Sequence, residues 1–189
     1  MPLEPINEKE VRLYARAPEG ADDILHECIQ EMKELSYRVC YAEFEIKFLD
    51  DALDLGFAVT RSKDLRKALD KCEKIILFAS TVGNLPDRLT ARYTRIAPSK
   101  ALFIQAIGAE RVEALCDAFC KEIKKQYADF VTVPRFSPGY GDLPLFMQKD
   151  IFATLDCPKN IGVTLNDSLL MLPTKSVTAI IGLKKDVLK

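Results

Sequence analysis

The run Lys74–Ser80 constrains the fold of this chain more than any other feature of its sequence. Its middle consists of the large apolar residues Ile75 to Phe78, with no polar residue between them. A continuous apolar run of this length is typical of a β-strand that is buried on both faces. Other elements must therefore cover this strand from two sides.

Helical periodicity is found on both sides of this run. Asn7 followed by Glu10 is a capping-box pattern that opens a helix, and Ser62 is expected to cap another. Acidic residues gather where the second helix begins, as the helix dipole favours. We expect helices at residues 8–16, 18–35, 63–72, 85–96, 98–127 and 145–155.

A period of two replaces the helical pattern from Arg38 to Phe48 and predicts a strand. Asp50 and Asp51 mark a turn, and residues 53–60 are expected to return as the second strand of a hairpin. Further strands are expected at residues 130–133, 169–172 and 176–183, with a turn at 157–160. Because helices and strands mix without regular βαβ alternation, we predict an α+β fold. We expect one domain over residues 1–189, with a largely antiparallel sheet and flanking helices.

The composition excludes several classes of function. Lys and Arg number 27 and Asp and Glu number 28, so a net charge of -1 provides no whole-chain attraction to nucleic acid or to an anionic membrane. A single His among 189 residues leaves no multi-histidine metal site and few routes to general-base catalysis. We therefore predict no metal site, no catalytic side chain, and chemistry with little proton transfer.

The six cysteines form no CxxC pair and no zinc-ligand spacing. Cys116 and Cys120 lie four apart, on one face of a helix, and are interpreted as small buried apolar residues. The start of the chain lacks the basic and apolar regions of a secretory signal. No stretch approaches the ~18–20 apolar residues that a membrane span needs. A reducing, cytoplasmic location is expected.

The segment Arg135–Tyr140 (RFSPGY) is the most informative one for function. Pro134, directly before the segment, and Pro138 within it restrict the backbone, and Gly139 allows a positive φ or the close approach of a ligand. The planar fork of an arginine suits a carboxylate, and the ring of Tyr140 can face a cation or stack on a base. A rigid structural loop, in which Arg135 pairs with Asp142, is the alternative interpretation.

A longer pattern joins this segment to the residues after it. It begins with RxxxGYxxxP at residues 135–144, and its later positions are Ile151, Gly162, Leu165, Ser168, Met171, Pro173, Ser176 and Val177. With this spacing the chain resembles the activation domain of cobalamin-dependent methionine synthase. The upstream segments Ala106–Gly108 and Val112–Asp117 also resemble the helix that precedes the motif, so the match covers about residues 101–181.

The resemblance implies binding of S-adenosylmethionine. The positions that correspond to ligand-binding positions of the family are Arg135, Gly139, Tyr140, Asp142 (through its backbone), Asp117 and Asp129. In the family the motif arginine grips the ligand carboxylate and the motif tyrosine lies along the ligand. The two acids are glutamates there, and the aspartates here are shorter. An aspartate near the start of the fused domain and a tyrosine after its last strand have no counterpart, so we expect weaker affinity or completion of the site by another chain.

The implied reaction is reductive methylation, in which cob(II)alamin takes an electron and the resulting cob(I)alamin removes the methyl group of S-adenosylmethionine. The sulfonium is already an excellent leaving group, so the transfer needs alignment and exclusion of water rather than an acid or a base. The implied partners are a core cobalamin-dependent methionine synthase or another corrinoid protein, which presents cobalamin, and a flavodoxin-like or iron–sulfur electron donor. The chain would be an accessory part of this methyltransferase system.

Two other hypotheses stay open at this point. The chain could reactivate a different corrinoid methyltransferase, because no motif marks the surface that meets cobalamin. It could also be a non-catalytic S-adenosylmethionine sensor or binding module.

Overall fold

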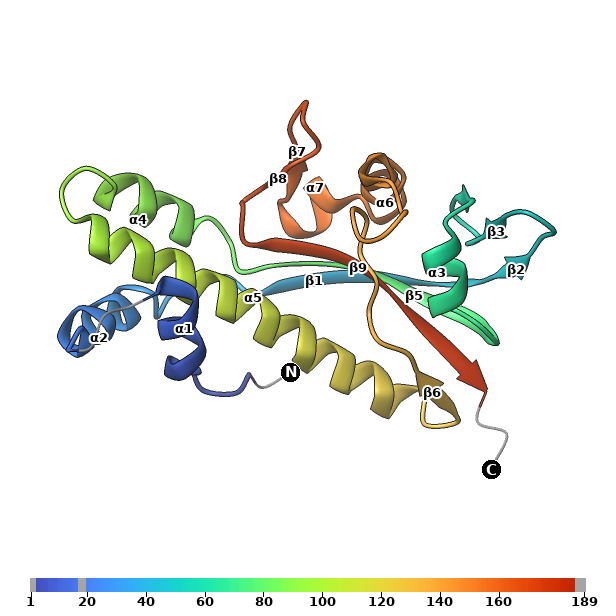
Figure 1. Ribbon diagram of the computed structural model, residues 1–189, viewed down its shortest axis with the longest axis horizontal. Coiled ribbons are helices and arrows are strands. Elements are labelled where there is room, and N and C mark those ends of the chain that lie inside the picture. Colours follow the sequence, from blue (N-terminus) through green and yellow to red (C-terminus); the bar gives the residue numbers. More distant parts are fainter. Residues whose placement is uncertain (1–2, 17–19, 186–189) are drawn as a thin grey trace.

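The centre of the protein is a four-stranded sheet (Figure 1). The computed structural model describes residues 3–16 and 20–185. The strands lie in the order β1 (Arg38–Glu45), β5 (Cys72–Thr81), β9 (Ser176–Lys185) and β6 (Phe130–Thr132). Every neighbouring pair is antiparallel. The predicted α+β fold with a largely antiparallel sheet is confirmed.

Strand β5 is buried on both faces, as its apolar run predicts. Ile75 and Leu77 belong to the core on one face of the sheet, whereas Ile76 and Phe78 belong to the core on the other face. All four side chains are fully buried. Burial of each such side chain contributes roughly 1.5–3 kcal/mol. The sheet therefore has two separate cores, with β5 between them.

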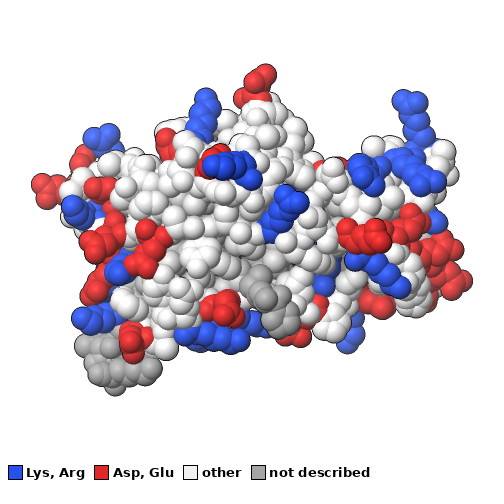
Figure 2. Space-filling model, turned by 180° about the vertical axis from the view of Figure 1, so that it is seen from behind, with Lys and Arg blue, Asp and Glu red and all other residues white. Residues whose placement is uncertain are grey.

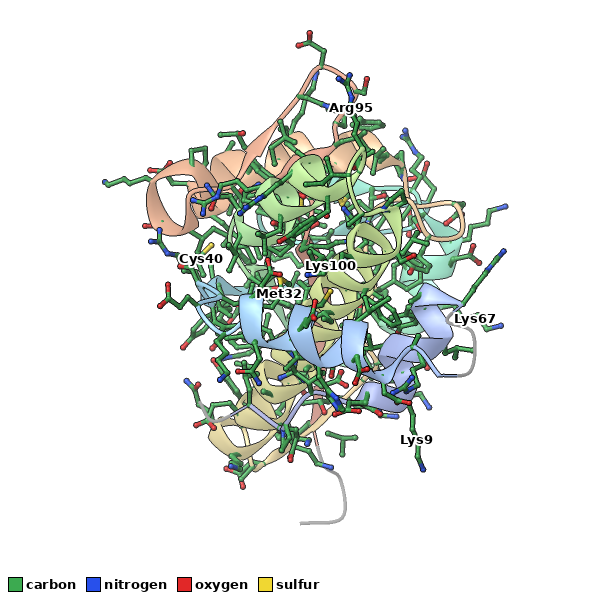
Figure 3. The ribbon with its side chains drawn as sticks, turned by 90° about the vertical axis from the view of Figure 1, so that its left-hand side faces the viewer. Lys9, Met32, Cys40, Lys67, Arg95 and Lys100 are labelled. Carbon is green, nitrogen blue, oxygen red and sulfur yellow. The ribbon has the colours of Figure 1, made fainter. Side chains whose placement is uncertain are left out.

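The long helix α5 (Pro98–Gln126) covers the face of Ile76 and Phe78. Its first half also packs on the helices α1 (Glu8–Ala15), α2 (Asp22–Glu31) and α4 (Leu85–Tyr93). Figure 3 shows Met32 and Lys100 where these helices meet, and Met32 is buried in their common core. Lys100 pairs there with Glu27, with 2.7 Å between Nζ and Oε2.

Shorter elements cover the opposite face (Figure 1). The helical ones are α3 (Lys63–Ala68), the 3-10 helix η1 (Leu145–Met147), α6 (Gln148–Leu155) and α7 (Cys157–Ile161). Two small antiparallel sheets accompany them: β2 (Lys47–Phe48), β3 (Leu53–Asp54) and β4 (Val59–Thr60) form one, and β7 (Thr164–Leu165) and β8 (Met171–Leu172) form the other.

Two predicted helix caps are confirmed. The side chain of Asn7 accepts a hydrogen bond of 3.4 Å from the backbone N–H of Glu10. The hydroxyl of Ser62 accepts one of 3.0 Å from the backbone N–H of Leu65. Each cap satisfies an N–H group that has no partner within its own helix.

Several helix boundaries differ from the expectations. The second helix ends at Glu31, before residue 35, and its expected start at Pro18 and Glu19 lies outside the described residues. The helix expected at residues 63–72 ends at Ala68, because the chain turns sharply at Lys71 (φ 61°) to enter β5. The expected turn at residues 157–160 is wrong, since these residues form most of α7.

The strand expected at residues 53–60 is two short strands, because Gly56 turns between them with a φ of 79°. The predicted hairpin exists only where Lys47–Phe48 pairs with Leu53–Asp54. Strand β1 pairs with β5 instead. Because β5 is buried, its backbone N–H and C=O groups must find hydrogen-bond partners within the protein. Strand β1 supplies these partners along one side of β5.

On the face shown in Figure 2, basic and acidic side chains alternate over much of the surface, and acidic side chains gather at the right-hand end of the view. Within residues 3–16 and 20–185, no helix is both long and apolar enough to cross a membrane.

Candidate ligand-binding site

The loop of residues 134–144 joins β6 to η1 and is anchored at both of its ends. Phe136 pairs with Ile180 of β9 through two backbone hydrogen bonds of 2.9 and 2.8 Å. At the other end Leu143 is buried, and its carbonyl accepts a bond of 2.9 Å from Gly139 N–H. Gly139 has a φ of 91°, a conformation that L side chains rarely adopt. The loop is therefore closed on itself and fixed against the central sheet.

Asp142 ties this loop to helix α3. Its carboxylate accepts hydrogen bonds from Ser62 Oγ and from the backbone N–H groups of Lys63 (2.7 Å) and Asp64 (3.2 Å). In return, Asp142 N–H donates to Asp64 Oδ2 at 3.1 Å. The hydroxyl of Ser62 and these N–H groups hold the pKa of Asp142 below its ordinary value. The alternative in which Asp142 pairs with Arg135 is therefore wrong.

Arg135 instead faces helix α5. Its Nη1 donates to Asp117 Oδ1 at 2.5 Å, and its Nη2 donates to a carboxylate oxygen of Glu113. Burial disfavours the charged form of Arg135, but the hydrogen bond to Asp117 and the nearby charge of Glu113 outweigh it, so the pKa of Arg135 is raised. Arg135 is thus a permanent, well-oriented cation.

A cavity of about 460 Å³ opens beside this arginine. Pockets for small ligands measure about 300–1,000 Å³, so its size suits such a molecule. The loop, α5, η1, α6, β8, β9 and the segment before β8 contribute its lining: Glu113, Arg135, Phe136, Ser137, Pro138, Tyr140, Leu145, Gln148, Leu169, Leu170, Met171, Ser176, Val177 and Thr178. Gln148 and Thr178 are buried in its wall, where the threonine hydroxyl donates to Gln148 Oε1 at 2.9 Å. The two charged lining residues, Glu113 and Arg135, contact each other, and apolar side chains form most of the rest.

The six predicted site residues differ in their relation to this cavity. Arg135 and Tyr140 line it, and Tyr140 is exposed at 69%. Gly139 shapes the loop next to Tyr140 without lining the cavity. Asp142 points its carboxylate to α3.

The two predicted acids are also placed differently. Asp117 holds Arg135 but lines a neighbouring cavity of about 320 Å³ between α5 and the chain before α1. Asp129 is exposed in the turn that follows α5 and lines neither cavity. From Asp117 to the end of α5 at Gln126 the helix rises about 13 Å, so the structure does not bring Asp129 to the arginine.

Sequence reasoning missed Glu113, the second carboxylate partner of Arg135. The available signal was its spacing: Glu113 lies four residues before Asp117 and so on the same face of α5. Within the described ranges, no group of His, Cys, Asp and Glu side chains has the arrangement of a metal site. Arg135 and its two carboxylate partners can recognise the charged groups of a ligand and orient it in the cavity.

The sheet, its helices and this cavity define an α+β domain with a candidate ligand-binding site at the loop of residues 134–144. The family model for the activation domain of vitamin B12 dependent methionine synthase matches residues 63–187. The chain belongs to this family. The matched region starts at α3, well before the segment that carries the sequence motif.

A solved structure shows the same fold. It is the crystal structure of the MetH reactivation domain bound to AdoHcy (S-adenosylhomocysteine), with a TM-score of 0.65 and 18% sequence identity. The alignment covers 98% of this chain and 69% of that chain. A search of curated proteins finds no significant match.

Proposed function

We propose that this chain binds S-adenosylmethionine in the cavity beside Arg135 and supports reductive methylation of cob(II)alamin in a partner methionine synthase. The observation that carries the proposal is the oriented guanidinium of Arg135 in the wall of the cavity. Membership of the activation-domain family supports the same ligand class.

The charges of the site complement this ligand. S-adenosylmethionine carries a carboxylate, an ammonium and a sulfonium, so it has one net positive charge. The cluster of Arg135, Glu113 and Asp117 has one more carboxylate than cation. The arginine suits the ligand carboxylate because its N–H groups form a planar fork. The nucleoside and the methyl-bearing chain would then extend along the apolar part of the cavity.

The proposed contacts are those that the family resemblance implies, and the loop geometry supports them. Tyr140, which lines the cavity, would lie along the ligand, and Gly139 and the backbone at Asp142 shape the loop beside it. Asp117 orients the arginine. Asp129 remains a candidate only for a contact outside this cavity.

Cobalamin, presented by a core methionine synthase and reduced by a flavodoxin-like or iron–sulfur donor, supplies the nucleophile that accepts the methyl group. The task of this chain is to hold the methyl donor in line and to exclude water around it. No proton has to move in this transfer, because the sulfonium is already a good leaving group. All six cysteines are free thiols, as is usual in the reducing cytoplasm in which we place the protein.

The ligand assignment is tested by calorimetric titration of S-adenosylmethionine into wild type and Arg135→Ala. Loss of a desolvated charge pair costs about 2–5 kcal/mol in binding free energy. Arg12→Ala is the matched control, because Arg12 pairs with Asp22 among the N-terminal helices and lies outside the cavity. If wild type binds no S-adenosylmethionine, either alone or with a cobalamin protein present, the ligand assignment is wrong.

The reaction is tested with a core methionine synthase in the cob(II) state, S-adenosylmethionine and a reductant. Appearance of the methylcobalamin spectrum only when this chain is present supports the proposal. Binding of the ligand without methylcobalamin formation would instead favour a binding module, or a different corrinoid partner.

A further inference from the structure

The two carboxylates that hold Arg135 do not face the same space. Glu113 lines both the candidate ligand cavity and its neighbour, whereas Asp117 lines only the neighbour. Among the described residues around the ligand cavity, Glu113 is the only carboxylate. The two acids therefore have different access to a molecule bound beside Arg135.

Asp117 and Glu113 each accept one N–H of Arg135, from Nη1 and from Nη2. An incoming carboxylate makes its strongest contact with two parallel N–H groups of the fork. On the cavity side, the carboxylate already at the fork is that of Glu113, and a second carboxylate beside it would be repelled by its charge.

We propose that Glu113 exchanges partners when the ligand binds: it leaves Arg135 to the ligand carboxylate and receives the ligand ammonium. This inference rests on the proposed function. In an α-amino acid the ammonium and the carboxylate are bonded to one carbon atom, so a carboxylate displaced from Arg135 lies next to the ammonium. One ion pair is exchanged for two, and neither charge of the site is left without a partner. Asp117 stays on Arg135 and keeps it oriented.

The exchange makes the site selective for an intact amino-acid group. A ligand without the ammonium would displace Glu113 and leave its carboxylate unpaired, which is costly in a partly desolvated site. A nucleoside without the amino-acid chain would leave the Arg135–Glu113 pair closed. The class of ligand that opens the pair is therefore an S-adenosyl amino acid.

The experiment compares S-adenosylmethionine with its deamino analogue, in which hydrogen replaces the α-ammonium, by calorimetric titration. Glu113→Gln keeps the size of the side chain and removes its charge. We expect it to weaken S-adenosylmethionine by about tenfold or more, the scale for a hydrogen bond between charged groups. The affinity for the deamino analogue should rise instead, because this ligand leaves the Glu113 carboxylate unpaired in wild type and the variant has no such charge.

Three further variants separate contact from positioning. Asp117→Asn should weaken both ligands by the same factor, because Asp117 acts through Arg135. Glu122→Gln is the matched control, an exposed glutamate on the same helix that pairs with Lys125, and it should change neither affinity. Glu113→Asp keeps the charge with a shorter reach and should bind S-adenosylmethionine more tightly than Glu113→Gln does. The unfolding temperatures of all four variants are measured beside that of wild type, so that affinities are compared only between folded proteins.

The outcomes of the two proposals are distinct. If wild type binds S-adenosylmethionine and Glu113→Gln weakens both ligands equally, the exchange is wrong and Glu113 only positions Arg135. If wild type binds neither ligand, the proposed function itself is wrong and the exchange is rejected with it.

Discussion

The two faces of the central sheet are stabilised in different ways. On one face, regular elements meet through apolar side chains: Phe78 of β5 packs with Phe119 of α5, with 4.9 Å between ring centroids. The other face also has an apolar core, but the irregular loop of residues 134–144 is fixed at its surface by polar contacts. We expect stability and ligand recognition to depend on different residues, although α5 serves both: Phe119 packs in the core and Glu113 holds Arg135. Substitutions can test whether the two are separable.

The largest expected effect is on the α5 face. Phe78→Ala removes a fully buried ring, and such a truncation costs about 3–5 kcal/mol in the free energy of unfolding. Chemical denaturation measures this loss. The affinity of the remaining folded protein for S-adenosylmethionine should equal that of wild type, because Phe78 lies outside the cavity.

Phe146→Ala is the control for this loss, since Phe146 is 60% exposed. Its free energy of unfolding should change by less than about 0.5 kcal/mol. A change in ligand affinity in Phe78→Ala would show that the two faces are coupled, against the separation described above.

A smaller effect is expected where the loop meets α3. Ser62 caps α3 through Leu65 N–H and also donates to Asp142, so Ser62→Ala removes a cap and one anchor of the loop. Loss of a cap costs about 1 kcal/mol in the free energy of unfolding. Here, unlike in Phe78→Ala, the affinity for S-adenosylmethionine should also fall.

Ser99→Ala removes an exposed hydroxyl near the start of α5 and serves as the matched serine variant. It should change neither unfolding nor affinity. If Ser62→Ala lowers stability but leaves the affinity intact, the anchoring by α3 does not contribute to the ligand site.

The smallest effect is a dependence of stability on pH. The hydrogen bonds of Ser62, Lys63 and Asp64 lower the pKa of Asp142 in the folded protein. A lowered carboxyl pKa stabilises the fold above the unfolded value of about 3.9, and this contribution is lost as the pH falls through the folded value. Between about pH 4 and pH 2, the unfolding temperature of wild type should therefore fall more than that of Asp142→Asn. Parallel curves for the two proteins would contradict this role of Asp142.

The elements of the α5 face could be predicted because their information is local. The apolar run of β5 and the helical period of α5 are visible within a few residues of sequence. The structure has both elements where these patterns predict them. The errors arose where a single backbone conformation ends an element, as at Lys71 and Gly56. Such positions carry little periodic signal.

The candidate site could be predicted only in part. Arg135 and Tyr140 were found from the motif, and both line the cavity. Asp117 is expected in the site as a ligand contact, but its pairing with Arg135 is not expected and Glu113 is missed, because these acids lie 18 and 22 residues from the arginine along the chain. Asp142 was expected as a ligand contact through its backbone, whereas the role of its side chain depends on Lys63, which is 79 residues away.

Most helices, the buried strand β5 and the loop with the charge-recognising arginine can be read from the sequence alone. That β1 pairs with β5, that Asp142 faces α3, and that Arg135 lies between Glu113 and Asp117 follows only from the folded chain. The difference arises because burial and helical period are properties of neighbouring residues. The choice of an ionic partner instead depends on which of many similar carboxylates the folded chain brings within hydrogen-bond distance.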